Sequence, residues 1–150
     1  MEASSPAKLY CLLVGGVVLL VGILGFFYES SFAVGDEVIA EELLGAIVVN
    51  GWANVIHIVI GGLGLLAANS FARQYALGIG AIYIVLSILG FIAVESSDGI
   101  SFVAENGVLI DLVPVDNQEN VLHAVLGVLG LLAGFATKET AGAPAPAAPA

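Results

Sequence analysis

Two segments of the chain, 54–68 and 120–134, repeat one pattern, and this repeat limits the possible folds more than any other feature. The second segment begins 66 positions after the first (120 against 54). In both, Asn, His and small residues recur every three or four positions, which places them on one face of a helix. The other positions are almost all Val, Ile or Leu. A helix of this kind suits a bilayer, where the face that carries the small and polar residues turns towards other helices. The pattern therefore predicts membrane-spanning helices.

The composition supports a membrane protein and excludes one class of partner. Hydrophobic residues make up 59% of the chain and charged residues only 11%, with a mean hydropathy of +1.06. The charged share is less than half of the roughly 25% found in soluble domains. The net charge is −10 and only three residues are Lys or Arg. Because phosphate binding needs clustered cations, nucleic acid is excluded as a partner.

The apolar runs predict an all-α integral membrane protein, a bundle of four transmembrane helices within residues 9–136. Each run approaches the roughly 20 residues that cross a bilayer core. The predicted helices cover about 9–28, 52–68, 75–94 and 120–136. Residues 29–51 and 95–119 are predicted as acidic outer loops, in which the apolar run 43–50 lies in the interface or lengthens the second helix. Residues 1–8 form a cytoplasmic tail, and the Ala/Pro-rich tail 137–150 is expected to be disordered.

The three cations predict the orientation of the bundle. Lys8 precedes the first helix, Arg73 joins the second and third, and Lys138 follows the fourth. Four spans place all three on one side, and the positive-inside rule makes that side cytoplasmic. Both termini are therefore predicted to be cytoplasmic, with the acidic loops outside.

The matches at offsets of 65 and 66 extend beyond the two histidine segments to the helices that precede them. Each half is therefore predicted to be a two-span hairpin, and the two hairpins share one orientation because each crosses the membrane twice. Small residues on the helix seams allow close helix packing in lipid. The predicted packing glycines are Gly15, Gly22, Gly25, Gly61, Gly64, Gly80, Gly90, Gly127 and Gly130. Gly16, Gly62 and Gly78 lie off these seams and are predicted to contact a second copy or a partner subunit.

His57 and His123 are the only histidines, and each has an Asn three residues earlier, Asn54 and Asn120. Polar groups inside a membrane bundle usually face its interior and pair there. The favoured interpretation is a polar clasp between the second and fourth helices, in which each Asn bonds the neighbouring imidazole.

Three other interpretations of the histidines remain open. Paired histidines among glycines are typical of a bis-histidine haem site, although no Lys or Arg lies on the outer side to meet the propionates. A divalent metal could be bound by His57 and His123 with Asp116 or Glu119. A titratable histidine beside acidic loops could also relay protons or ions through a small transporter or channel.

The residues around the first histidine also resemble a known family. The motif Asn50-Gly-Trp-Ala-Asn54-Val-Ile-His57, followed by Gly61-Gly-Leu-Gly64, is similar to a family of small prokaryotic membrane proteins catalogued as domain of unknown function 4383. The resemblance covers about residues 9–136. It implies a multi-pass protein of the prokaryotic plasma membrane and no particular activity. Where the family pattern has a second histidine, this chain has Ala53.

No pattern in the sequence supports an enzyme. A Ser-His-Asp arrangement, a phosphate-binding loop, a Cys-x-x-Cys pair and paired membrane carboxylates are all missing from the sequence. We therefore expect a non-enzymatic structural or accessory protein, in contact with membrane lipid, as a homo-oligomer or a subunit of a membrane complex. No cofactor is predicted in that role, whereas haem or a divalent metal belongs to the alternatives.

Overall fold

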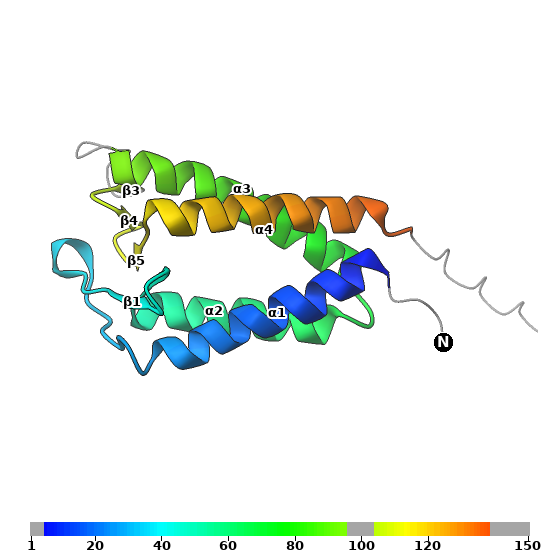
Figure 1. Ribbon diagram of the computed structural model, residues 1–150, viewed down its shortest axis with the longest axis horizontal. Helices are drawn as coiled ribbons and strands as arrows, with labels where there is room; N and C mark the ends of the chain where they lie inside the picture. Colours follow the sequence, from blue (N-terminus) through cyan, green and yellow to red (C-terminus); the bar gives the residue numbers. More distant parts are fainter. Residues whose placement is uncertain (1–4, 96–103, 139–150) are drawn as a thin grey trace, which may run out of the picture.

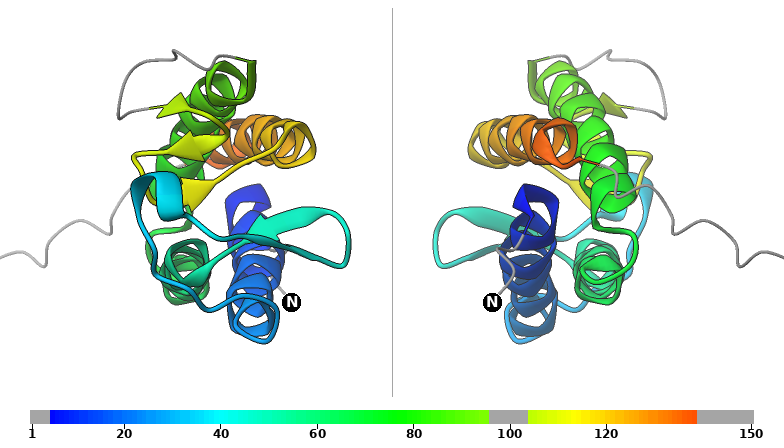
Figure 2. Two further views of the ribbon diagram at one scale, coloured as in Figure 1. Left: turned by 90° about the vertical axis from the view of Figure 1, so that its left-hand side faces the viewer. Right: turned by 90° about the vertical axis from the view of Figure 1, so that its right-hand side faces the viewer.

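The computed structural model describes residues 5–95 and 104–138, and within them the protein is mostly helical. Its four α-helices are α1 (Pro6–Gly25), α2 (Gly51–Ala67), α3 (Ala72–Glu95) and α4 (Asn117–Ala136). Helix α1 packs along α2, and α3 packs along α4, so the bundle has two layers of two helices (Figures 1 and 2). The α2–α3 link lies at the same end of the bundle as the start of α1 and the end of α4 (Figure 1).

Helices α1, α3 and α4 each begin three residues earlier than predicted, and polar caps explain the early starts of α1 and α4. The Ser5 hydroxyl accepts a hydrogen bond from the Lys8 amide at 3.2 Å, and Pro6 occupies the first helical position, which needs no amide donor. Helix α1 therefore starts at residue 6 instead of 9 and ends at 25 instead of 28. In α4 the Asp116 carboxylate accepts from the Glu119 amide at 2.7 Å, and the helix starts at 117 instead of 120.

The prediction of an all-α protein with plain outer loops is wrong in one respect, because both loops contain short antiparallel strands. In the first loop β1 (Glu41–Leu43) pairs with β2 (Ile47–Val49), after the 3-10 turn η1 (Gly35–Glu37). In the second, β3 (Ala104–Glu105), β4 (Val108–Leu109) and β5 (Val113–Pro114) form a three-stranded sheet. Residues 96–103 of the predicted second loop, and 139–150 of the predicted tail, lie outside the described residues.

The apolar run 43–50 thus forms the turn and second strand of a hairpin, and it does not extend α2. Its β-branched residues favour a strand, and the turn between the strands uses positive φ angles of 56° at Leu44 and 67° at Gly45. Asn50 follows the strand and caps α2, because its side chain accepts a hydrogen bond from the Ala53 amide at 2.9 Å.

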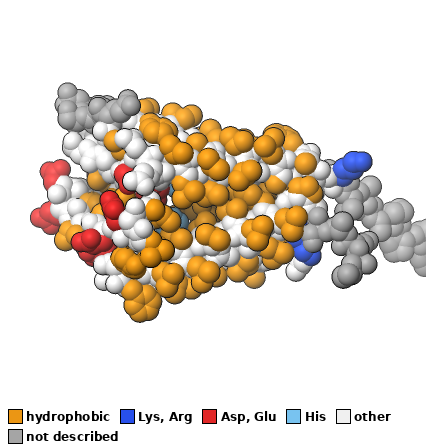
Figure 3. Space-filling view, viewed as in Figure 1, with side chains coloured by type: hydrophobic (Ala, Val, Ile, Leu, Met, Phe, Trp, Pro, Cys, Tyr) orange, Lys and Arg blue, Asp and Glu red, His pale blue; other side chains and the backbone are white. Residues whose placement is uncertain are grey.

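Three helices, α1, α3 and α4, are long and apolar enough to cross a membrane. Helix α2 is apolar but has 17 residues, which is the lower end of the usual range of roughly 17–25. The space-filling view shows an apolar belt along the helices, with acidic side chains at one end and basic side chains at the other (Figure 3).

Two tyrosines, which the sequence analysis did not single out, join the two helix pairs. The Tyr10 hydroxyl on α1 donates to the Leu126 carbonyl on α4 at 3.1 Å. The Tyr75 hydroxyl on α3 donates to the Ile60 carbonyl on α2 at 2.8 Å. The two tyrosines are 65 positions apart and the two carbonyls 66 positions apart, which are the offsets of the repeat. These offsets are the sequence signal that could have identified the two tyrosines as equivalent.

Candidate functional site

The glycines of the predicted seams lie where helices touch. A methyl group added at any of the nine would come within 3.1 Å of an atom of another helix. At Gly15, for example, the nearest atoms belong to Gly61 and Gly64 of α2. By contrast, an added methyl at Gly16, Gly62 or Gly78 would meet nothing within 4 Å. These contacts bring the helix backbones close and set the position of the polar residues between them.

The two asparagines lie inside the helix pairs and are fully buried. The Asn54 amide group donates to the Glu29 carbonyl, just beyond the end of α1, at 2.8 Å, and its side chain packs on Gly25. Asn120 packs on Gly90 of α3 in the same way, but its side-chain amide has no hydrogen-bond partner among the described residues.

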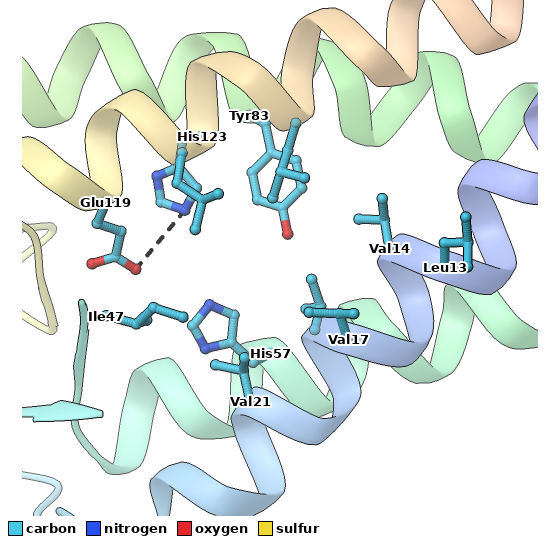
Figure 4. A pocket seen from close by; sticks show the side chains of 12 residues that line it. Leu13, Val14, Val17, Val21, Ile47, His57, Tyr83, Glu119 and His123 are labelled. Atoms are coloured by element: carbon cyan, nitrogen blue, oxygen red, sulfur yellow. Dashed lines mark ion pairs between the residues drawn. The ribbon is translucent and has the colours of Figure 1, made fainter. Parts of the chain in front are cut away.

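The hydrogen bonds predicted from Asn54 to His57 and from Asn120 to His123 are not formed. Atom Nδ1 of each histidine is buried without a hydrogen-bond partner among the described residues. The reason is geometric. Each Asn turns towards the glycine of its neighbouring helix, whereas both imidazoles point between the two helix pairs (Figure 4).

Between the helix pairs, His57, Tyr83, Glu119 and His123 form a group that we call the polar cluster (Figure 4). The rings of Tyr83 and His123 are stacked, with centroids 5.1 Å apart and an interplanar angle of 19°. Glu119 Oε1 lies 4.0 Å from His123 Nε2, which is an ion-pair distance and too long for a hydrogen bond. His57 faces this group from α2, so the cluster draws on both helix pairs.

Two apolar crevices meet at the polar cluster, and all four of its residues line both. The first crevice, of about 210 Å³, lies between α1 and α4; its other lining residues are Leu13, Val14, Val17, Val18, Val21, Ile47, Leu122 and Leu126. The second, of about 200 Å³, lies between α2, α3 and the strands β4 and β5. Its other lining residues are Ala53, Ile56, Ile60, Ile82, Leu86, Leu89, Leu109, Ile110, Val113 and Val115.

Glu119, one of the candidate metal ligands, lies in the cluster, but its side chain takes an unexpected direction. The spacing Asp116-x-x-Glu119 is that of a capping box, in which the Glu side chain would return to the cap residue. Asp116 does cap α4, but the Glu119 side chain turns into the bundle, where it is 2% exposed and its Oε2 has no hydrogen-bond partner among the described residues. A buried carboxyl without a full set of partners costs free energy, which marks the position as a site of interest.

Of the four residues predicted as metal ligands, the structure brings three to the crevices and leaves Asp116 at the helix cap. Within residues 5–95 and 104–138, no three His, Cys, Asp or Glu side chains lie close enough together to hold a metal ion. His57, Glu119 and His123 therefore share one surface without forming a closed coordination shell.

These features define a small helical protein whose apolar helices are compatible with a membrane and whose interior holds a polar cluster between apolar crevices. A protein-family model described as Domain of unknown function (DUF4383) matches residues 8–136, and the chain belongs to this family. The family resemblance inferred from the sequence is thus confirmed. Comparisons with curated proteins and with solved structures give no match.

Proposed function

We propose that the protein crosses the plasma membrane of a prokaryotic cell four times and acts, without catalysing a reaction, as a structural or accessory subunit. The observation that supports this most is the exposed apolar surface. Large apolar side chains face outwards along every helix, for example Leu13 (67% exposed), Leu66 (79%) and Phe135 (71%). In water, a continuous surface of this kind would cause aggregation, whereas lipid or partner helices cover it.

The charges at the two ends of the bundle support cytoplasmic termini. Lys8, Arg73 and Lys138 all border one depression at the end of the bundle where α1 begins, α4 ends and the α2–α3 link lies (Figure 1). At the opposite end, Asp36 and Asp111 border another depression, and the Gly35 amide donates to the Asp111 carbonyl at 2.8 Å. A cationic end and an acidic end separated by an apolar belt fit the positive-inside rule.

Equivalent contacts support a construction from two parallel hairpins. Gly25 packs on Asn54 in the first helix pair, and Gly90 packs on Asn120 in the second. The Tyr10 and Tyr75 hydrogen bonds likewise occupy equivalent positions. In this arrangement α2 is a full span, and tilt of the helix or local thinning of the bilayer accommodates its 17 residues.

Cysteine labelling in intact bacterial cells tests the four-span topology. In a Cys11→Ser background, single cysteines replace Ser5, Asp36, Ser70 or Asp111. A membrane-impermeant maleimide should label positions 36 and 111 in intact cells, and positions 5 and 70 only after permeabilisation. Labelling of position 70 in intact cells would show that α2 does not cross, and the four-span proposal would then be wrong.

Association with a second copy or a partner subunit is tested at the glycines that have open space outside the seams. Gly62→Cys in the Cys11→Ser background should give an oxidative dimer in membranes, because small residues at lipid-facing positions allow helices of two molecules to approach closely. Leu66→Cys, one turn further along α2 and 79% exposed, is the matched comparison for random collisions. Equal cross-linking of the two variants would contradict a defined contact through Gly62.

A haem or metal role remains the second candidate, because His57 and His123 border the same crevices from α2 and α4. An optical spectrum and elemental analysis of the protein in mild detergent test it. A Soret band or a stoichiometric metal that the His57→Ala/His123→Ala double variant loses would establish a cofactor protein. A colourless, metal-free wild type would leave the accessory role.

A further inference from the structure

The two crevices are open towards the outer surface of the bundle. Leu13 and Val17 line the first crevice and are 67% and 60% exposed, so this crevice reaches the surface between α1 and α4. Ile56 and Ile82 line the second and are 39% and 48% exposed. Figure 3 shows histidine atoms in a hollow of the apolar face near the acidic end. In a membrane these openings face lipid, so a molecule dissolved in the bilayer can enter them.

Apolar residues of the outer strands border the same crevices towards the acidic end. Ile47 of β2 lines the first crevice, and Leu109 of β4 and Val113 of β5 line the second. Leu109 is 4% exposed and belongs to an apolar group with Ala93 of α3 and Val115. The walls of both crevices are therefore apolar on the side of the loops, which favours entry from the bilayer over entry from water.

At the inner end of both crevices, polar atoms lack partners. Glu119 Oε2, His57 Nδ1 and His123 Nδ1 are all buried without a hydrogen bond among the described residues. Glu119 is 2% exposed and His123 8% exposed. Leaving a buried polar atom unpaired is unfavourable, so a ligand that supplies the missing partners would bind here favourably.

The charges of the cluster restrict the head group of such a ligand. All three Lys and Arg residues of the chain lie at the opposite end of the bundle, so none stands beside Glu119 to hold a phosphate or a carboxylate. An anionic head group therefore has no counterion here, and we take an uncharged head group, which needs none. The stacked rings of Tyr83 and His123 form a flat wall beside the head group. Both helix pairs supply polar groups, His57 from the first pair and Glu119 and His123 from the second.

We propose that the two crevices and the polar cluster bind a membrane-soluble quinone, with its ring between His57 and His123 and its apolar tail in a crevice. A quinone has a flat uncharged ring with two carbonyl oxygens at opposite edges, and each oxygen accepts a hydrogen bond from an imidazole N–H. Each crevice, of about 210 or 200 Å³, is by itself smaller than the roughly 300–1,000 Å³ of small-molecule sites, and the proposed ring position is where the two crevices share their lining residues. The proposal rests on the membrane location and involves binding alone.

Direct binding of a decyl-substituted benzoquinone tests the proposal. We expect isothermal titration of the full chain in mild detergent to show saturable binding with one ligand per chain. His57→Phe and His123→Phe should each weaken binding about tenfold, because each removes one hydrogen bond to the head group and keeps a ring of similar size. Melting curves by circular dichroism show whether each variant is folded.

A pair of variants on α1 separates binding in the crevice from partition into the micelle. Val17→Phe places a larger side chain at the mouth of the first crevice and should weaken binding at least tenfold. Leu20→Phe is the matched control, because Leu20 is 58% exposed and does not line either crevice. Equal binding by the two variants, or non-saturable binding by the wild type, would overturn the proposal.

Solvent extraction of the purified protein gives a second readout. The proposal expects a quinone in the extract, in an amount that the Val17→Phe variant reduces. An extract that contains only phospholipid, together with a wild type that binds no added quinone, would overturn it. The maleimide labelling described above is unaffected by this result, so the two proposals can fail separately.

Discussion

Replacing Gly22 by alanine should weaken the packing of α1 against α2, whereas the same replacement at Gly16 should not. A methyl group at Gly22 would lie 2.6 Å from the Asn54 carbonyl oxygen and 2.7 Å from the Ile58 amide nitrogen. Both are backbone atoms of α2 and cannot rotate out of the way. At Gly16, in the middle of the same helix, the methyl group would meet nothing within 4 Å.

The two variants share one contribution to stability and differ in another. Alanine favours the helix over glycine by about 0.8–1.0 kcal/mol in both cases. Overpacking a close contact costs about 1–3 kcal/mol, and only Gly22→Ala has this cost. Because the helix propensity cancels in the difference, Gly22→Ala should be less stable than Gly16→Ala by about 1–3 kcal/mol. Gly16→Ala itself should equal or slightly exceed the wild type.

Reversible unfolding by SDS in mixed micelles, followed by far-ultraviolet circular dichroism, measures this difference. The slopes of the two transitions should agree, so that a shift of the midpoint reports stability alone. Gly80→Ala and Gly78→Ala form the corresponding pair on α3, where a methyl at position 80 would lie 2.8 Å from the Leu131 amide nitrogen. If both close-contact variants were as stable as their open-space controls, the helices would not be packed as described.

Four further variants can be measured in the same unfolding assay. Tyr10→Phe and Tyr75→Phe should each lower stability by about 0.6–1.7 kcal/mol, because each removes a hydrogen bond between helices. Tyr28→Phe is the control and should have no effect, since the Tyr28 side chain is 46% exposed. Glu119→Leu should raise stability by about 1–3 kcal/mol, because it removes a buried oxygen without a partner; a loss of stability would instead show a structural role for the carboxyl. Asp116→Ala should lower stability by about 0.5–2 kcal/mol through loss of the α4 cap, and an unchanged midpoint would show that the cap is dispensable.

The helices could be predicted because their apolar residues and small-residue seams span whole segments. Three of the four predicted spans are long and apolar enough to cross a membrane. The start of α1 was misplaced because the Ser5-Pro6 cap is a local signal that overall hydropathy does not contain. The strand Ile47–Val49 was missed because three apolar residues are too few to show a period of two, and they adjoin a helix of similar composition.

The site was harder to predict, because residue spacing shows which side chains share a face of a helix but not which residues they contact. An Asn three residues before a His shares its face, but Asn54 bonds the Glu29 carbonyl instead, which only the packing of α1 determines. Glu119 lies at the position of a capping-box glutamate, so its inward direction has no signature in the sequence. His57 and His123 occupy equivalent positions in the repeat, but equivalent positions do not determine whether two side chains meet. The structure places both at the same crevices.

Two departures from the repeat lie at the polar cluster. Tyr83 corresponds to Val18 at an offset of 65, and Glu119 corresponds to Ala53 at an offset of 66. All four of these residues line the crevices, and both polar members lie in the second helix pair. The packing glycines recur in both helix pairs except Gly22, which corresponds to Ser87. The cluster therefore has one histidine in each half and two further polar groups in the second half only. This arrangement is consistent with the ligand proposed above, which both helix pairs would contact.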